Sequence, residues 1–251
     1  MTTEGIDISS SNPPVDGAAI YKSGRRFAWV RVAAGTVKDS HFAEHLRELQ
    51  GSGLLVGAYL FDQPDADEHE VIGRTMDALG GIELDMPLAV DVEIMGHLAP
   101  AKFADRLALL EAEAIDAHGR SPLMYTGPGF WSMLGVEGKR PAFAALDLWV
   151  AHYGVSKPSI PAPWSAWKFW QHHANTIWWL NGTTGFGSWR MPKGARVIAQ
   201  PGVCPGVLGE VDLDTFNGTE DELRAWASPS AASPAASPMP RDTEPPERAA
   251  A

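Results

Sequence analysis

The sequence has almost no cysteine and no long apolar run, and these two absences exclude several classes of protein. Cys204 is the single cysteine in 251 residues, which excludes an intramolecular disulfide framework and any site built from several cysteines. No stretch approaches the roughly 18 uninterrupted apolar residues that a membrane-spanning helix needs, so we expect no membrane insertion. Packing must therefore supply the stability of the fold.

Basic residues are also scarce relative to acidic ones. The chain has 20 Lys and Arg residues against 31 Asp and Glu residues, a formal net charge of −11. Such a chain is unsuited to an electrostatic grip on nucleic acid, so we expect no nucleic-acid partner. Residues 1–14 lack the basic stretch followed by an apolar run that marks a secretory signal peptide. This predicts a protein that is cytoplasmic until it is released.

What the sequence does have is a globular composition over most of its length. Hydrophobic residues make up 45% and charged residues 20%, which is enough to bury a core. Residues 228–251 differ, because they are mainly Ala, Pro and Ser with no aromatic residue. Such a segment buries too little apolar surface to offset its ordering entropy. We predict a folded unit over residues 1–227 and a disordered tail or linker over residues 228–251.

Short β-rich runs alternate with helical patterns through the first half of the chain. Strands are predicted at residues 5–9, 27–33, 54–61, 86–94, 122–128, 146–154, 166–173 and 211–216. Between the second and third of these, Phe42, Leu46 and Leu49 recur at helical spacing. Strands that alternate with helices pair in parallel, and this many units predict a closed, TIM-like α/β barrel. The later strands follow one another with little helix between them, so the barrel is expected to be irregular.

Acidic residues occur where a barrel places its chemistry, at one mouth formed by strand ends. Asp7 lies near the end of the first strand, Asp91 and Glu93 end the fourth, and Asp212 lies in the last. Carboxylates that converge make one another costlier to ionise, which keeps one of them protonated near neutral pH. A carboxyl group beside a carboxylate is what glycoside hydrolysis requires.

Alternation along the fourth strand gives the orientation of its acids. Asp91 and Glu93 are two residues apart, so we expect both side chains on the inner face, with Cα atoms roughly 6.6 Å apart. Val90 and Val92 should then point outward, towards the helices. Aromatic residues on the predicted strands or at their ends offer rings on which a sugar can stack, or rings that fill the core.

Six motifs occur in the order in which they are found in one family: GIDIS, GAYLF, PLAVDVE, PLMYTGPGFW, LWVAHYG with PAPWSAWKFWQ, and GEVDLDTF. Over residues 5–216 the sequence resembles glycoside hydrolase family 25, the Chalaropsis-type lysozymes of bacteria and phage endolysins. The resemblance implies a barrel of five β/α units plus three further strands. It implies a muramidase that cleaves the β-1,4 bond between N-acetylmuramic acid and N-acetylglucosamine in bacterial peptidoglycan. We expect a monomer that uses no metal or other cofactor.

The resemblance also assigns roles to residues. Glu93 resembles the general acid and Asp91 its partner carboxylate, which we expect to stay ionised, while Asp7 and Asp212 resemble the other acids of the groove. The positions implied to surround the substrate are Tyr59, Phe61, Tyr125, Trp149, Tyr153 and Gln171. An enzyme nucleophile and attack by the substrate's own 2-acetamido group both fit this set.

The sequence departs from the family pattern in four places. GIDIS is followed by SSNPP where an aromatic–Gln segment is usual, Leu60 stands where His is common, and Asp214 stands where Asn is usual. Residues 172–210 replace a shorter link and predict an inserted hairpin beside the groove. The tryptophans of this insertion are Trp178, Trp179 and Trp189.

Two other functions fit parts of the sequence. A non-catalytic wall-binding or virion structural module would keep the barrel, although binding alone needs no four converging acids. A metal-dependent polysaccharide hydrolase or deacetylase would use His152, His172 or His173 with a carboxylate, although no compact spacing such as H-E-x-x-H is present. Adjacent His172 and His173 are expected on opposite faces of their strand. A peptidoglycan muramidase of the phage endolysin kind is the function that the sequence favours.

Overall fold

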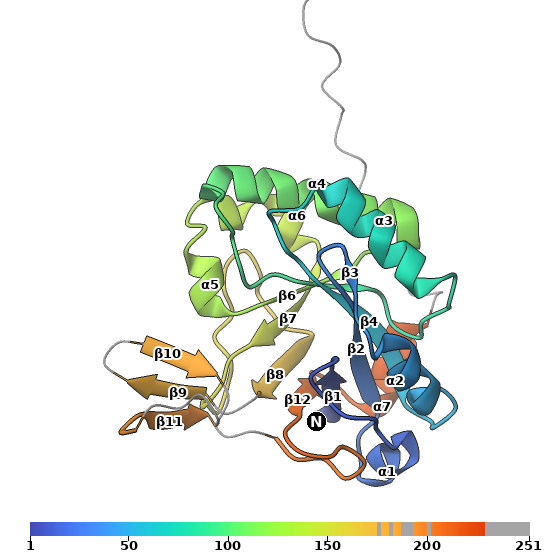
Figure 1. Ribbon diagram of the computed structural model, residues 1–251. Coiled ribbons are helices and arrows are strands. Elements are labelled where there is room, and N and C mark those ends of the chain that lie inside the picture. The colour runs from blue at the N-terminus through green and yellow to red at the C-terminus, as the bar shows by residue number, and fades with distance from the viewer. Residues whose placement is uncertain (175–176, 181–182, 187–192, 200–201, 229–251) are drawn as a thin grey trace, which may run out of the picture.

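The computed structural model describes residues 1–174, 177–180, 183–186, 193–199 and 202–228, and they form a closed barrel (Figure 1). Around the barrel the strand order is β1-β12-β8-β7-β6-β5-β4-β2, and β2 pairs with β1 to close it. The barrel strands are β1 (Thr3–Ile8), β2 (Phe27–Ala34), β4 (Leu55–Phe61), β5 (Ala89–Asp91), β6 (Leu123–Thr126), β7 (Asp147–Ala151), β8 (Phe169–His173) and β12 (Asp212–Phe216). A ninth strand, β3 (Val37–Lys38), pairs with β2. The predicted α/β barrel is confirmed.

One strand runs against the others. From β1 through β2, β4, β5, β6 and β7 to β8, neighbours pair in parallel, whereas β12 is antiparallel to both β8 and β1. The beginning of β12 therefore lies at the mouth where the other strands end. In the register of β1 and β12, Asp212 stands opposite Asp7.

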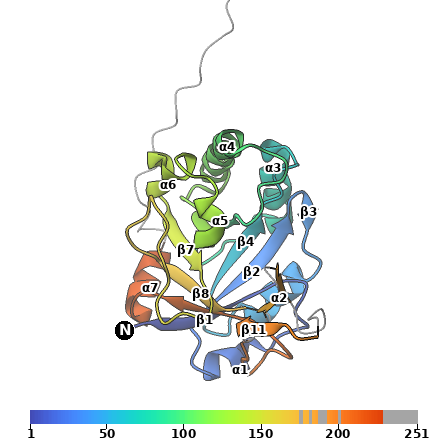
Figure 2. The ribbon, with the colours of Figure 1, turned by 90° about the vertical axis from the view of Figure 1, so that its left-hand side faces the viewer.

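Helices follow the first five barrel strands, as predicted, and few follow the last three. They are α1 (Gly17–Lys22), α2 (Phe42–Leu49), α3 (Glu68–Leu79), α4 (Pro100–His118), α5 (Pro128–Ser132), the 3-10 turn η1 (Glu137–Lys139), α6 (Pro141–Ala144) and α7 (Glu220–Ala227). Asp67 caps α3 by accepting from the Glu70 N–H, and Gly80 ends it at φ 60°, a conformation that glycine adopts without strain. Figure 2 shows α3 and α4 side by side over one side of the barrel. Within the described residues, no helix has the length and apolar character needed to cross a bilayer.

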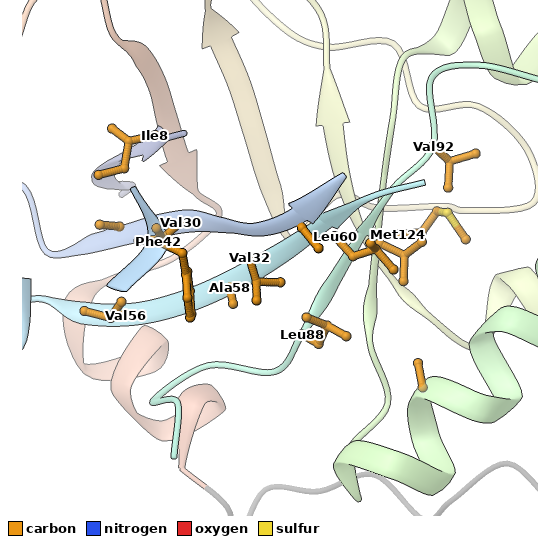
Figure 3. Packing of buried hydrophobic residues seen from close by; sticks show 14 of the residues in the cluster. Ile8, Val30, Val32, Phe42, Val56, Ala58, Leu60, Leu88, Val92 and Met124 are labelled. Atoms are coloured by element: carbon orange, nitrogen blue, oxygen red, sulfur yellow. The ribbon is translucent and has the colours of Figure 1, made fainter. Parts of the chain in front are cut away.

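A large apolar layer fills the space between strands and helices (Figure 3). Val90 and Val92 belong to it, together with Leu107 of α4, so the predicted outward orientation of the two valines is confirmed. Leu60, at the position where His is common in the family, is also in this layer and fully buried. Each such side chain contributes on the order of 1.5–3 kcal/mol by leaving water.

Aromatic rings fill the inside of the barrel. Trp29 stacks on Trp149 with ring centroids 5.1 Å apart, and Phe27 meets Phe169 edge-on at 5.0 Å. Glycine makes room for the Trp29 ring, because a Cβ atom on Gly57 would lie 2.4 Å from it. These rings fill the floor beneath the mouth of the barrel.

A small antiparallel sheet stands apart from the barrel. It contains β9 (Ile177–Leu180), β10 (Thr183–Phe186) and β11 (Arg196–Ala199), in the order β10-β9-β11. The predicted hairpin is thus β9 with β10, and a third strand extends it. Trp178 and Trp179 lie on β9, whereas Trp189 and the predicted tail beyond residue 228 lie outside the described residues.

Candidate active site

The mouth of the barrel holds a cavity of about 410 Å³. Its walls include all four acids that the sequence singled out, Asp7, Asp91, Glu93 and Asp212. The first three lie at or just beyond the ends of parallel strands. Asp212 lies at the same mouth because β12 is antiparallel and begins there. The expected convergence of carboxyl groups is therefore present.

Glu93 reaches the cavity from a loop rather than from a strand. The predicted strand at residues 86–94 shortens to β5, which ends at Asp91. The backbone stays tied to β6 just beyond that point, because the Val92 N–H donates to the Tyr125 carbonyl at 2.9 Å and the Thr126 hydroxyl to the Val92 carbonyl at 2.8 Å. Asp91 is buried, whereas Glu93 opens to solvent at the rim.

Both members of this pair have a raised pKa. Burial among protein atoms, followed by the charge of Asp7, raises the pKa of Glu93 to about 7. Burial, followed by the charge of Glu93, raises the pKa of Asp91 well above its usual value, although Arg31 opposes this. Asp91 is the more deeply buried of the two, and the expectation that it is ionised when the reaction takes place stays a prediction. Two such close carboxyl groups titrate as a pair.

A hydrogen-bonded chain of side chains connects Glu93 to Asp7. The Tyr125 hydroxyl lies 3.4 Å from Glu93 Oε1 and donates to Gln171 Oε1 at 2.8 Å. The Tyr153 hydroxyl donates to the same oxygen. Gln171 Nε2 in turn donates to Asp7 Oδ2 at 2.6 Å. Burial raises the pKa of Asp7 to about 6, against the lowering effect of its hydrogen bonds to Gln171 and Asp214.

Asp214 lies beneath this chain, fully buried in the barrel. The Trp149 indole N–H donates to Asp214 Oδ1 at 2.8 Å, and the carboxyl group is in hydrogen-bond contact with Asp7. Burial raises the pKa of Asp214 well above its usual value, and the negative charge of Asp7 adds to the effect.

Arg31 is a basic residue of the pocket that our reading of the sequence missed. It lines the cavity, donates from Nε to buried Asp39 Oδ2 at 2.8 Å, and lowers the pKa of Asp7 and Asp91 through its charge. The alternation of Phe27, Trp29 and Arg31 along β2 carried the signal, because the first two point into the barrel and the third follows in the same phase.

The predicted substrate positions divide into wall and core. Tyr59, Phe61, Tyr125, Trp149 and Gln171 all line the cavity, and Tyr153 contacts it through Gln171. Trp149 is only 1% exposed and stacks on Trp29, so it belongs mainly to the core. Phe61 is half-buried and offers more of its ring.

Two loops that the sequence did not assign to the site complete the wall. Ser11, Asn12 and Pro13, in the segment that departs from the family pattern, line the cavity. Residues 208–210, between the small sheet and β12, line it as well. Asn12 joins the two loops, since its Nδ2 donates to the Glu210 carbonyl at 3.1 Å.

The histidines lie elsewhere. His172 and His173 line a separate cavity of about 1060 Å³ with Glu4, and His172 Nε2 is 3.6 Å from Glu4 Oε2. Their Nδ1 atoms are 2.6 Å apart, so the expectation that the two side chains lie on opposite faces of the strand is wrong. The pairing of β12 with β8 shifts register beside them, and this shift breaks the alternation. In the described part of the chain, no three His, Cys, Asp or Glu side chains are grouped to hold a metal ion.

Comparison with known proteins gives consistent matches. Residues 6–178 match the family model described as Glycosyl hydrolases family 25, so the match ends before Asp212. Lysozyme M1 of Streptomyces globisporus is 25% identical over 241 residues, which cover 90% of this chain and 71% of that protein. The N,O-diacetylmuramidase of Chalaropsis sp. is 29% identical over 188 residues, 68% of this chain and 88% of that protein. The crystal structure of a bacterial lysozyme from Streptomyces coelicolor superposes with a TM-score of 0.72 at 24% identity, over 90% of this chain and 97% of that one.

Proposed function

This chain belongs to glycosyl hydrolases family 25 and is a glycosidase, and from that premise we propose that its pocket cleaves the glycan of bacterial peptidoglycan. The bond is the β-1,4 link between N-acetylmuramic acid and N-acetylglucosamine. The observation that carries the proposal is the meeting of Asp7, Asp91, Glu93 and Asp212 in one cavity. A carboxyl acid and a carboxylate in one groove are the groups that this hydrolysis uses.

Glu93 is the proposed proton donor. It stands at the rim, where the oxygen of the departing sugar can reach it, and its pKa of about 7 keeps a proton available near neutral pH. The Tyr125 hydroxyl beside it limits the directions in which the carboxyl group can turn. Proton transfer to the glycosidic oxygen then breaks the bond as positive charge grows on the other sugar.

Asp91 is the proposed partner for that charge. It lies deeper than Glu93, and burial, followed by the charge of Glu93, raises its pKa. The reactive form places the proton on Glu93 and the negative charge on Asp91, next to the developing oxocarbenium centre or the acetamido group that attacks it. Arg31 favours this form because its charge lowers the pKa of Asp91.

The two alternative functions predict different behaviour from the muramidase. A wall-binding module would bind walls without releasing sugar ends, and a metal-dependent hydrolase would lose activity with a chelator. The four acids in one cavity support the muramidase over the binding module. His172 and His173 line a separate cavity with Glu4, away from the four acids. Neither of them can therefore serve as a metal ligand beside these acids, as the metal-dependent hydrolase would require.

The direct test is digestion of purified cell walls by the purified chain. We expect loss of turbidity, and mass analysis after borohydride reduction should find N-acetylmuramitol at the new ends. Release of N-acetylglucosamine ends instead, or no release, would contradict the proposal. Addition of a chelator should leave the rate unchanged.

Two finer parts of the proposal concern how the protein works. We propose that it acts as a monomer, which light scattering in solution tests. We also propose a role of the phage endolysin kind, in which the enzyme acts once the membrane has been permeabilised. Expression in a bacterial host, followed by permeabilisation, should then lyse the cells, and a Glu93→Gln variant should not lyse them.

A further inference from the structure

Asp7 of β1 and Asp214 of β12 lie on neighbouring antiparallel strands inside the barrel, and each influences the pKa of the other. Two carboxyl groups this close need a proton if they are to share a hydrogen bond. Asp214 stands opposite Gly5 on β1, two positions from Asp7. Gly5 has no side chain, so the diagonal neighbour of Asp214 on the inner face is Asp7 itself. Asp214 is fully buried, and Asp7 is 5% exposed.

The surrounding donors indicate which of the two acids carries that proton. The Tyr125 and Tyr153 hydroxyls both donate to Gln171 Oε1, which directs the amide NH2 towards Asp7 Oδ2. Asp7 therefore acts as an acceptor. The Trp149 indole, which can only donate, occupies Asp214 Oδ1. The remaining oxygen of Asp214, Oδ2, has no donor among the described residues.

We infer that Asp214 is a positioning residue that stays protonated at working pH and donates a hydrogen bond to Asp7. Asn is usual at this position, and its amide NH2 can donate a hydrogen bond. A protonated Asp214 would donate one in the same way. Its donation, together with that of Gln171, would fix the Asp7 carboxylate at the wall of the pocket. The inference rests on the proposed function in so far as Asp7 serves the reaction.

The charges that face the pair favour this arrangement. Burial raises the pKa of Asp214, and the charges of Asp7 and Asp212 raise it further. Arg31 stands on the side of Asp7 and favours the ionised form there. The other titratable groups around the cavity are Tyr59, Asp91, Glu93, Tyr125 and Tyr153.

Infrared spectroscopy tests the proton without requiring catalysis. The difference spectrum of the wild type minus Asp214→Asn at pH 7 should contain the C=O band of a protonated carboxyl group, and this band should shift in D2O. The same band should persist in Glu93→Gln minus the double variant with Asp214→Asn. A difference that contains only a carboxylate band would overturn the inference, whether or not the wild type cleaves walls.

Activity tests the donor. Asp214→Asn supplies an amide NH2 to Asp7 and an oxygen to Trp149, so it should keep kcat within about threefold of the wild type. Asp214→Leu has a similar size but no donor, and its kcat should fall at least tenfold. Equal losses in the two variants, each checked for folding by circular dichroism, would overturn the inference. If the wild type itself releases no sugar ends, the proposed function fails, and the infrared result still decides whether Asp214 is protonated.

Discussion

Asp62 and Arg106 form a buried ion pair, with 2.7 Å between Asp62 Oδ2 and Arg106 Nη1. Asp62 follows the end of β4, and its backbone N–H donates to the Asp91 carbonyl at 2.9 Å. Arg106 comes from α4 and also donates to the Ala66 carbonyl at 3.1 Å. The pair therefore connects α4 to the end of β4 beside Asp91. The charge of Asp62 raises the pKa of Asp91, and Arg106 compensates that charge.

Removing Arg106 should destabilise the protein. Arg106→Met leaves Asp62 buried without its cation, which should lower the free energy of unfolding by about 3–5 kcal/mol in urea titrations. Adding Asp62→Asn should recover most of the loss. Arg74→Met, on an exposed residue of α3, is the matched control and should change stability by less than about 0.5 kcal/mol. A loss below about 1 kcal/mol for Arg106→Met would show that the pair is not a structural tie.

Asp91→Asn should stabilise the fold while it damages the chemistry. The folded-state pKa of Asp91 lies above its unfolded value, so the stability of the wild type is lost as pH rises through that interval. The stability advantage of the variant should therefore grow from pH 4 to pH 7, by up to about 1.4 kcal/mol per pH unit. Meanwhile kcat should fall by at least about a hundredfold. If Asp91→Asn unfolds more readily than the wild type at pH 7, the charge of Asp91 does not destabilise the fold. Asp77→Asn, a substitution of an exposed residue, is the control.

Activity should fall on the alkaline side of neutrality. Glu93 must be protonated to act as an acid, and its pKa is about 7. Above that pH, kcat/KM on a soluble glycan fragment should fall about tenfold per pH unit, and ionisation of the partner carboxylate should set an acidic limb. A profile that stays flat to pH 9 would mean that Glu93 is not the titrating acid.

The small sheet should affect binding more than chemistry. It stands outside the barrel and contributes none of the four acids of the pocket. Replacing residues 175–201 with a short Gly-containing turn, while keeping the loop at residues 208–210, should raise KM on cell walls and leave kcat nearly unchanged. A collapse of kcat in a folded variant would place part of the catalytic apparatus in this sheet.

Alternation along the strands and the order of the motifs predicted much of the fold and of the site. Successive side chains of a strand point to opposite faces, so the sequence indicates which of them point into the barrel. The four acids and the outward Val90 and Val92 follow from this rule, and Arg31 follows from it too once Phe27 and Trp29 are placed inside. The contact of Asp7 with Asp214 depends on the antiparallel entry of β12 and on its register, which no local pattern encodes.

Other features depend on local breaks in regular structure. β5 ends at Asp91, two residues before Glu93, and Val92 between them stays hydrogen-bonded to β6. The register shift beside His173 brings the two histidines together, against the simple alternation of a strand. A raised pKa for Asp91 depends on burial, which the sequence does not give directly.

The rate of wall hydrolysis by Glu93→Gln tests the assignment of the acid most directly. The substitution keeps the shape of the side chain and removes its proton donor, so kcat should fall by about two to four orders of magnitude. Binding to walls, circular dichroism and the unfolding midpoint should stay close to those of the wild type. Glu83→Gln, on an exposed residue outside the pocket, should hydrolyse walls at the wild-type rate. A folded Glu93→Gln protein that clears walls nearly as fast as the wild type would contradict the assignment of Glu93 as the catalytic acid.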